Sequence, residues 1–565
     1  MRCRRAQGLR AGLAIGALLA GQGAMVQAWA ADASTTGQST VAPAASPDSA
    51  ALSTVTGIGT PPPPTGVSVR LGNLESVFAE PNSAVGAVPK RPPGVTITPT
   101  LDLQEMFTDN VFDTAGNHQT DFITGLTPGI LINVQTPNVR GTVSYTPSFQ
   151  LYANDSSENN VGQYLNGSIN ATLLPKTLLL SAGAYMTELS TQGGLAPGGM
   201  TTLPGSTRAT TTILYVTPSF VHEFSETGTL RVSYSLQWAN QSGNANSVFG
   251  SILPYFLGSS ALTNQEIASF TTGPAFGRFN NTIDGIASEY ARAPILSAAH
   301  QYFVVDTLRF ALDRRAYIFG SAGYEDISYP HALPAFRIND GVWAAGLGIT
   351  PAPQSTLIVG YRHAYRVNSP ILDLALGLTA RTRLAVVYST SIATELQLLQ
   401  ATVSGSTVDA AGNSIVGETS APVLVANQLL SQESGLLRSS VASASLVTTW
   451  PRDTVSFSFL NDEQKLLANA PGTNGFSQES WSGGAGWVHA LTPRLTATSY
   501  LQIGSTNSKA VGPGWTPTLA GQVSFAYRLS PTLSASLIYQ VTDEWPSVGG
   551  NLLENTATVA LQNTF

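Results

Sequence analysis

The sequence predicts an all-β fold: a transmembrane antiparallel up-and-down β-barrel of about 22 strands, within a range of about 18 to 22. Three observations predict it. Charged residues make up only 11% of the 565 residues, whereas soluble proteins carry about 25%. Past the N-terminus, no apolar run approaches the roughly 20 residues that a transmembrane helix needs. Many segments instead alternate apolar and polar residues, as strands with two different faces do.

The composition also argues against a disordered chain. Hydrophobic residues reach 43%, and the 21 Phe, 18 Tyr and 8 Trp must be buried against something. Low charge combined with plentiful Ser, Thr, Asn, Gln and Gly fits a barrel with a lipid-facing outside and a wet inside.

Residues 1–30 are predicted to be a secretory signal peptide. Four arginines among the first ten residues precede an apolar core at Ala11–Ala20, and Ala28-Trp29-Ala30 is an A-x-A cleavage site. Cleavage there removes Cys3, the single cysteine, and takes the net charge from −7 to −11 because four arginines are lost. The mature chain then has no disulfide, thiolate nucleophile or zinc–thiolate site.

Residues 31–94 are rich in Ala, Ser, Thr and Pro and include a tetraproline at Pro61–Pro64. This composition predicts an extended, disordered periplasmic segment. Its more apolar stretch, Val67–Phe78, is either a docking peptide or a linker with a few hydrophobic residues, and the linker is favoured.

Residues 95–565 are predicted to form the barrel. In Val139–Leu151 one face is apolar, while the other carries Arg140, serines, threonines and Gln150. Leu230–Trp238 repeats this alternation with Arg231, two serines and Gln237. Such strands also occur in soluble β-sandwiches, but the number and length of the strands favour a barrel.

The connections alternate between short and long, as membrane barrels require on their periplasmic and external sides. Long Asn-, Gly- and Ser-rich loops, such as Asp109–Thr120, separate the tight turns. The tight turns are predicted at Thr136–Asn138, Pro175–Thr177, Glu226–Gly228, Pro351–Pro353, Pro451–Asp453, Thr492–Arg494 and Ser530–Thr532.

Two regions leave the strand count open. Gln241–His300 is either one long loop or contains an extra hairpin turning at Gly273–Gly277. Residues 393–437 form a long excursion with a helix-like start, which is either an external domain or an inward plug or cap. We favour the inward or capping role.

The last strand carries a predicted barrel-assembly signal. Val559, Leu561 and Phe565 share one face, and Phe565 is the final residue. An alternating strand that ends in an aromatic residue is typical of chains handled by the barrel assembly machinery, and pairing it leaves no open edge in lipid.

The chain resembles the exopolysaccharide-locus (PEP-CTERM-system-associated) outer-membrane β-barrel proteins over roughly residues 95–565. The matching stretches are short, and the resemblance implies the barrel more than it implies a role in polysaccharide secretion. They are Pro99–Leu101, Thr108–Phe112, Thr120–Ile123, Thr127–Gly129, Tyr145, Tyr152–Asp155, Gly273–Gly277, Gly360–Arg362 and Arg381–Ser391.

No chemical site stands out. The six histidines are scattered without metal-ligand spacing, and no G-x-S-x-G turn is present. We therefore expect no enzyme activity, metal or cofactor. Asp109 and Asn110 are either a rim contact for a sugar or ion, or an Asx turn, and the turn is favoured. Inward arginines either brace the wall against acidic partners, the favoured reading, or set a field for anionic solutes.

The lumen and rim candidates share strand parity or a rim position: Asp109, Asn110, Arg140, Gln150, Tyr152, Arg231, Gln237, Arg362 and Gln502.

Three functions follow as hypotheses. The first is a passive conduit or accessory in exopolysaccharide export, whose hydrophilic lumen offers many weak contacts. The others are a porin-like channel for small solutes and a non-transport, surface-exposed barrel. Expected partners are outer-membrane lipid, the barrel assembly machinery, a polysaccharide chain and periplasmic export components, with no nucleic acid.

Overall fold

The computed structural model describes residues 94–565 apart from residues 113, 191–207, 244–258, 353–354, 395–396, 398–405, 409–413, 417–434, 472–476, 509–513 and 547–549. The signal peptide and nearly all of the Pro-rich segment lie outside the described residues. Within the described part, no helix is long and apolar enough to cross a membrane.

The described residues are almost entirely strands, with 3₁₀ turns η3 at Ser156–Glu158 and η4 at Pro274–Phe276. The strands are β1 Gly94–Thr108, β2 Asp121–Gln135, β3 Val139–Tyr145, β4 Ser148–Tyr152, β5 Asn160–Gly162, β6 Leu165–Leu174, β7 Leu178–Ser190, β8 Arg208–Glu223, β9 Gly228–Gly243, β10 Ser259–Thr272, β11 Phe279–Ala291, β12 His300–Ala311, β13 Ala316–Tyr329, β14 Phe336–Ala352, β15 Ser355–Ala364, β16 Val367–Gly377, β17 Thr382–Thr394, β18 Ser406–Val408, β19 Ser414–Val416, β20 Gly435–Thr449, β21 Asp453–Asn469, β22 Gln478–Ala490, β23 Leu495–Ser508, β24 Trp515–Arg528, β25 Leu533–Glu544 and β26 Leu552–Thr564.

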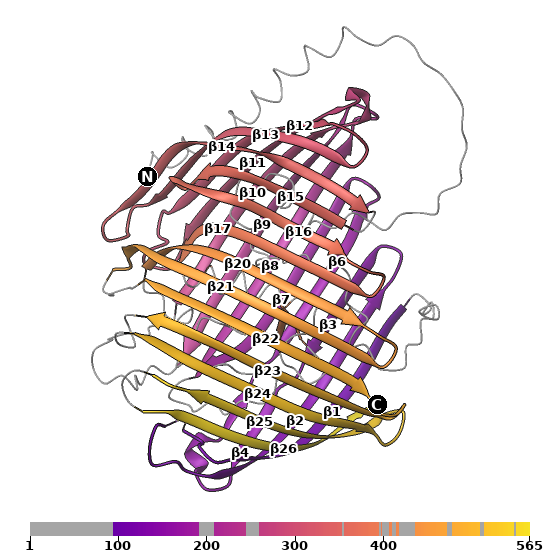
Figure 1. Cartoon of the computed structure of the whole chain (residues 1–565), viewed down its shortest axis with the longest axis vertical. Coiled ribbons are helices and arrows are strands. Elements are labelled where there is room, and N and C mark those ends of the chain that lie inside the picture. The colour runs from indigo at the N-terminus through magenta and orange to yellow at the C-terminus, as the bar shows by residue number, and fades with distance from the viewer. Residues whose placement is uncertain are drawn as a thin grey trace.

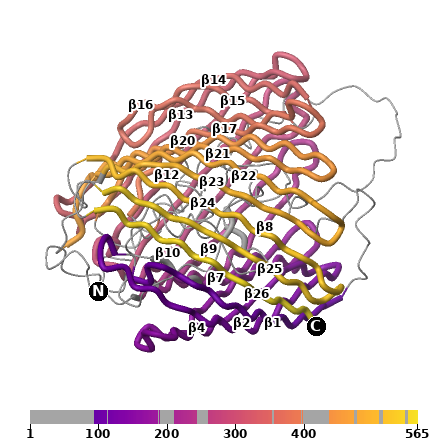
Figure 2. The backbone as a smooth tube through the Cα atoms, turned by 60° about the horizontal axis from the view of Figure 1, so that its bottom comes forward, coloured from indigo at the N-terminus to yellow at the C-terminus, as the bar shows by residue number. Residues whose placement is uncertain are grey.

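The strands form a closed antiparallel barrel (Figures 1 and 2). β1 pairs with β26 from Thr100↔Thr564 to Thr108↔Thr556, which closes the wall. β3 and β4 pair with β2 in one continuous register, and β5 and β6 continue each other in the same way. The 24 segments of the main sheet therefore make 22 wall strands, confirming the predicted fold, while β18 and β19 form a separate ribbon.

Six of the seven predicted tight turns join neighbouring wall strands at one end of the barrel, and at the seventh, between β14 and β15, Pro353 lies outside the described residues. Gly273–Gly277 also turns there, between β10 and β11, so the hairpin interpretation of Gln241–His300 is confirmed. This end also carries Gly94 and Phe565, and we call it the periplasmic end because short turns mark that side. The longer connections lie at the opposite, outer end.

The two faces of the wall differ as the alternation predicts. On β9, Val232 and Tyr234 are each 42% exposed, whereas the intervening Ser233 and Ser235 are 8% and 5% exposed. Most large exposed hydrophobic side chains elsewhere follow the same outward parity. Apolar side chains that face outward on a closed barrel meet lipid. Closing the wall also pairs the backbone groups of its edge strands, which hydrocarbon cannot satisfy.

Candidate functional site

Near the periplasmic turns, the inner face is exposed on β3 and β6 but buried at Thr282 of β11, Thr307 of β12 and Thr454 of β21. Arg140 and Thr142 on β3 and Asn170 on β6 lie near the periplasmic turns and are exposed. Along β9, burial increases toward the outer end, and Gln241 is only 1% exposed. The interior is therefore covered at its outer end, and any function of the lumen depends on what covers it.

The wall separates along one line near the outer end. β16 pairs with β17 only from Leu372↔Tyr388 to Gly377↔Arg383. Beyond Tyr388, β17 continues to Thr394 paired with β20 alone. β15 likewise ends at Ala364, while β14 extends past it toward Phe336, paired with β13 alone. The short β15–β16 hairpin thus leaves the tips of β14 and β17 without a shared neighbour.

The outer face of the separated β17 tip is buried, although the outer face of a barrel wall normally meets lipid. On β21, Phe457 and Phe459 are exposed to the outside, so Asp462 faces the lumen, and Ser439 of β20 donates a hydrogen bond to it at 2.9 Å. Ile392 pairs with Arg438, next to Ser439 on β20, and therefore lies on the opposite, outer face. Ile392 is nevertheless 2% exposed.

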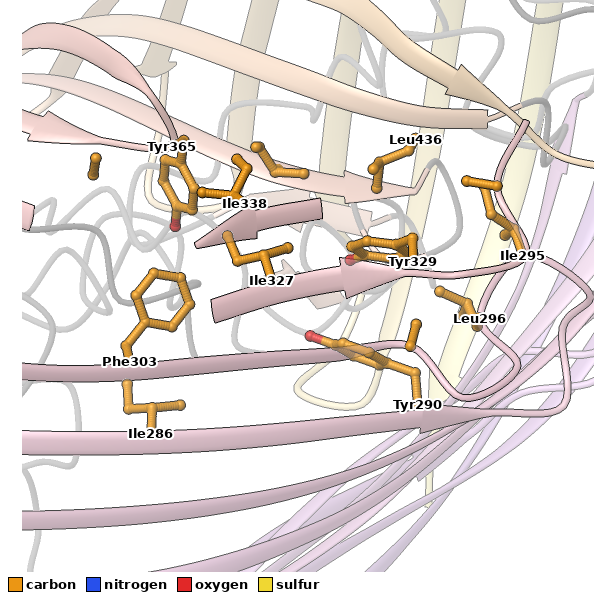
Figure 3. Packing of buried hydrophobic residues seen from close by; sticks show 14 of the residues in the cluster. Ile286, Tyr290, Ile295, Leu296, Phe303, Ile327, Tyr329, Ile338, Tyr365 and Leu436 are labelled. Atoms are coloured by element: carbon orange, nitrogen blue, oxygen red, sulfur yellow. The ribbon is translucent and has the colours of Figure 1, made fainter. Parts of the chain in front are cut away.

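A second layer of the wall covers this outer face. Ile392 and Leu436 belong to the same buried cluster as inward side chains of β11–β14. The barrel wall therefore overlaps itself at the outer end, with the tips of β17, β20 and β21 lying inside β11–β14. We call this cluster the mouth core (Figure 3); its larger members include Ile286, Tyr290, Ile295, Leu296, Phe303, Ile327, Tyr329, Ile338, Tyr365, Ile392 and Leu436.

Two loops at the outer end complete the overlap. The β11–β12 connection buries Ile295 and Leu296 completely within the mouth core. The β13–β14 connection reaches β21, where Leu333 and Asn469 exchange both backbone hydrogen bonds at 2.8 Å. The sheet order places β14, β15, β16, β17 and β20 between these two sites. The contact is thus a bridge across the overlap and not part of the wall ladder.

A small set of polar contacts crosses the overlap. The Gln301 amide on β12 donates to the Tyr329 hydroxyl at 2.6 Å and to the Ile392 carbonyl at 3.1 Å. Arg362 on β15 donates to the Thr390 carbonyl at 3.2 Å. These side chains satisfy carbonyls of β17 that a neighbouring strand would otherwise bind.

The β15–β16 turn is anchored inside the barrel. Tyr365 and Arg366 have φ of 58° and 56°, a left-handed conformation that favours glycine. The Glu325 carboxylate on β13 accepts the Tyr365 N–H at 2.7 Å, and the Tyr365 ring packs edge-on against Phe303 at 5.8 Å.

The predicted rim residues Asp109 and Asn110 join the two closing strands. The Asp109 carboxylate accepts hydrogen bonds from the backbone N–H and the side-chain amide of Asn555, both at 2.7 Å. The Asn110 amide donates to the carbonyls of Thr114 and Leu553, each at 3.0 Å. Both side chains therefore organise the loop and the β1–β26 seam at the rim, and a contact to a sugar or ion there stays a prediction.

The predicted lumen residues point inward but form no common site. Gln150 accepts from the Tyr152 hydroxyl at 3.4 Å, and Gln502 accepts from that of Tyr500 at 3.0 Å. Arg362 donates to Ser369 at 3.0 Å and belongs to the overlap. Gln150, Tyr152, Gln237 and Gln502 are at most 5% exposed. Arg231 is half-buried, and Arg140 is exposed near the periplasmic end.

Other predicted features have mixed outcomes. Val559, Leu561 and Phe565 are exposed on the outer face, and their role in assembly stays a prediction. In the excursion at 393–437, β17 extends to Thr394 and β20 starts at Gly435, and Gln397 accepts a 3.5 Å hydrogen bond from Tyr329. Most of the excursion lies outside the described residues, so the plug or cap also stays a prediction.

Apart from Arg362, sequence reasoning missed the residues of the overlap. Strand parity can assign residues such as Gln301 and Tyr329 to a face, but it cannot show that two parts of one wall lie over each other. The nearest signal is Tyr365-Arg366, a two-residue connection at the end where most loops are long. Among the described residues, no group of three or more His, Cys, Asp or Glu side chains is placed to hold a metal ion.

Comparisons with known proteins gave structural matches only. No family model and no curated protein matches the sequence. The FrpB iron transporter of Neisseria meningitidis is similar over 83% of this chain and 81% of its own, with 8% identity and a TM-score of 0.46. The ferric enterobactin receptor PfeA of Pseudomonas aeruginosa is similar over 84% and 81%, with 11% identity and a TM-score of 0.38.

OprD of Pseudomonas aeruginosa is similar over 83% of this chain and 95% of its own, with 9% identity and a TM-score of 0.31. These values assign no ligand to the present chain. Its own architecture decides its location: a closed 22-strand wall with apolar side chains outside and polar ones inside is an outer-membrane structure. The chain is an outer-membrane β-barrel of a Gram-negative bacterium.

Proposed function

We propose that the barrel is a non-enzymatic conduit for an exopolysaccharide, or an accessory of its export across the outer membrane. The observation that supports this best is the chemistry of the inner face. The buried polar side chains that the structure describes are mostly Ser, Thr and Gln, and the charged ones are Asp121, Asp284, Glu325, Arg362 and Asp462. Amides and hydroxyls offer many weak hydrogen bonds to a hydroxylated polymer without trapping it at one ion pair.

A polymer path through this interior requires a change at the outer end. Gln150, Tyr152, Gln237 and Gln502 would contact a passing chain only after the material that covers them moves away. The described state is therefore a resting state in this proposal, and the exposed periplasmic part of the inner face on β3 and β6 is the entrance. The resemblance over residues 95–565 to barrels of exopolysaccharide loci also supports the proposal.

The deciding experiment measures extracellular and periplasmic polysaccharide in a strain that lacks this chain. We expect loss of secreted polymer with periplasmic accumulation, and rescue by the intact chain. Unchanged secretion would refute the proposal. A matched control strain expresses the chain with Trp450→Ala, an exposed outward substitution that leaves the inner face intact.

A porin-like channel for small solutes is the second candidate, because the many amides and hydroxyls of the inner face suit neutral solutes as well as polymers. It predicts solute uptake by liposomes that contain the pure protein, together with normal polymer secretion in the deletion strain. A barrel without transport activity predicts neither conductance nor uptake.

A further inference from the structure

We propose that the overlap is the closed form of a gate at the outer mouth. The gate opens when the tips of β17, β20 and β21 (residues 389–394, 435–440 and 466–470, the gate tips) leave the inner face of β11–β14. This inference rests on the proposed channel function only in requiring that a solute passes through the lumen; the solute need not be a polysaccharide.

The gate tips are separable from the wall because one of their edges is not part of it. Among the described residues, β17 has no strand partner on the side of β16 from Ser389 onward. The carbonyls of Thr390 and Ile392 on this tip are held by the side chains of Arg362 and Gln301. Moving the tips therefore requires no break in the ladder between β16 and β17, unlike the displacement of a strand paired on both sides.

Pro370 explains why β17 does not also pair with the outer end of β16, residues 367–371. Continuing the register beyond Leu372↔Tyr388 would bring Thr390 opposite Pro370. Proline has no N–H to donate and is confined to edges and irregular positions of sheets. Complete pairing is therefore disfavoured, and the β17 tip is left free to take a second position.

The contact between the layers sets the resting position. Ile392, Leu436, Ile327 and Tyr329 are each at most 2% exposed, so separation would expose a continuous apolar surface. Apolar burial favours the closed form in water. A solute that binds the newly exposed inner face would favour the open form by its preference for that state.

The test locks the overlap with the double variant Leu333→Cys and Asn469→Cys. Residues that exchange both backbone hydrogen bonds in an antiparallel pair have Cα atoms about 5.5 Å apart, within the range of about 4.4–6.8 Å for disulfides. Cys3 is the only natural cysteine and lies in the predicted signal peptide, so no other thiol competes. The full mature barrel is reconstituted in planar bilayers, and single-channel conductance in KCl is recorded before and after reduction.

We expect the oxidised variant to remain at the closed baseline and the reduced variant to open as the unmodified chain does. The matched control is Thr496→Cys with Ala526→Cys, which joins the neighbouring strands β23 and β24 near the periplasmic end. Its conductance should not depend on oxidation. Unchanged openings in a variant whose disulfide is verified by mass would overturn the gate, as would the absence of conductance from the folded, unmodified and reduced chains.

A second variant tests the gate from the opposite direction. Leu436→Ser removes apolar contact from the overlap while retaining the backbone pairing of β20, so the fraction of time spent open should rise. Heat-dependent gel migration verifies that the barrel is folded. A folded Leu436→Ser barrel with an unchanged open fraction contradicts the gate, whereas a working gate with normal polymer secretion refutes only the polysaccharide proposal.

Discussion

Asp109 shows how one loop carboxylate can hold the closing seam of a barrel. It accepts two 2.7 Å hydrogen bonds from Asn555, on the strand that pairs with β1. Replacing Asp109 with Ala should lower the free energy of unfolding by about 1–2 kcal/mol, because hydrogen bonds to a charged acceptor are lost. Urea unfolding in lipid vesicles measures this change.

Asp109→Asn is the matched variant, since it keeps an oxygen acceptor and should lose less stability. If Asp109→Ala leaves stability unchanged but weakens binding of a sugar or ion, the residue is a rim contact and the seam interpretation fails.

Asp306 carries a second prediction at the scale of one residue. The structure places this acidic residue on the outer face of β12, exposed between the outward side chains of Val304 and Leu308. A carboxylate on the lipid face costs stability, so Asp306→Leu should stabilise the barrel by about 1 kcal/mol. Equilibrium unfolding in vesicles checks this. Destabilisation would indicate that the carboxylate has a partner in the membrane.

At the scale of the element, the β15–β16 hairpin has a turn whose residues do not suit its backbone. The side chain of Arg366 is exposed, yet its φ is 56°. A residue with a Cβ in this conformation destabilises the fold by about 1–2 kcal/mol. Glycine avoids that strain, but it loses more chain entropy on folding, which costs about 0.5–1 kcal/mol. Arg366→Gly should therefore raise the free energy of unfolding by roughly 0.5 kcal/mol.

Arg366→Ala separates the backbone effect from the loss of the guanidinium, because alanine keeps the Cβ that causes the strain. It should not stabilise the barrel in the same unfolding measurement. Equal gains from glycine and alanine would mean that the Arg366 side chain, and not its backbone, is the source of the strain.

Elements were predictable from the sequence where local patterns decide them. Period-two alternation and proline-containing turns located strands such as β3–β4 and β9 and the periplasmic connections. The break between β16 and β17 was not predictable, because Ile392 and Leu436 are apolar residues on a face that normally meets lipid. Only the three-dimensional course of the wall makes that face an internal surface. For the same reason Gln301 and Tyr329 could be placed on the inner face but not in contact with β17.

At the scale of the whole molecule, the barrel is asymmetric along its axis. Near the periplasm the inner face is accessible on β3 and β6, at Arg140, Thr142 and Asn170, whereas farther along the barrel Gln237 and Gln241 of β9 are covered. The overlap lies at the covered end. In the proposed export function, solute would enter from the periplasm and the overlap would control passage at the cell surface.

This asymmetry predicts different reactivity for cysteines placed at the two levels. In the folded barrel, Thr142→Cys should react with a soluble maleimide about tenfold or more faster than Gln237→Cys, since thiol reactivity follows exposure. In 8 M urea, a denaturing condition in which both sites are exposed, the rates should converge. Mass spectrometry follows the labelling. Equal rates for the two single variants in the folded state would mean that the outer half of the lumen is open, and the resting structure would then need no gate.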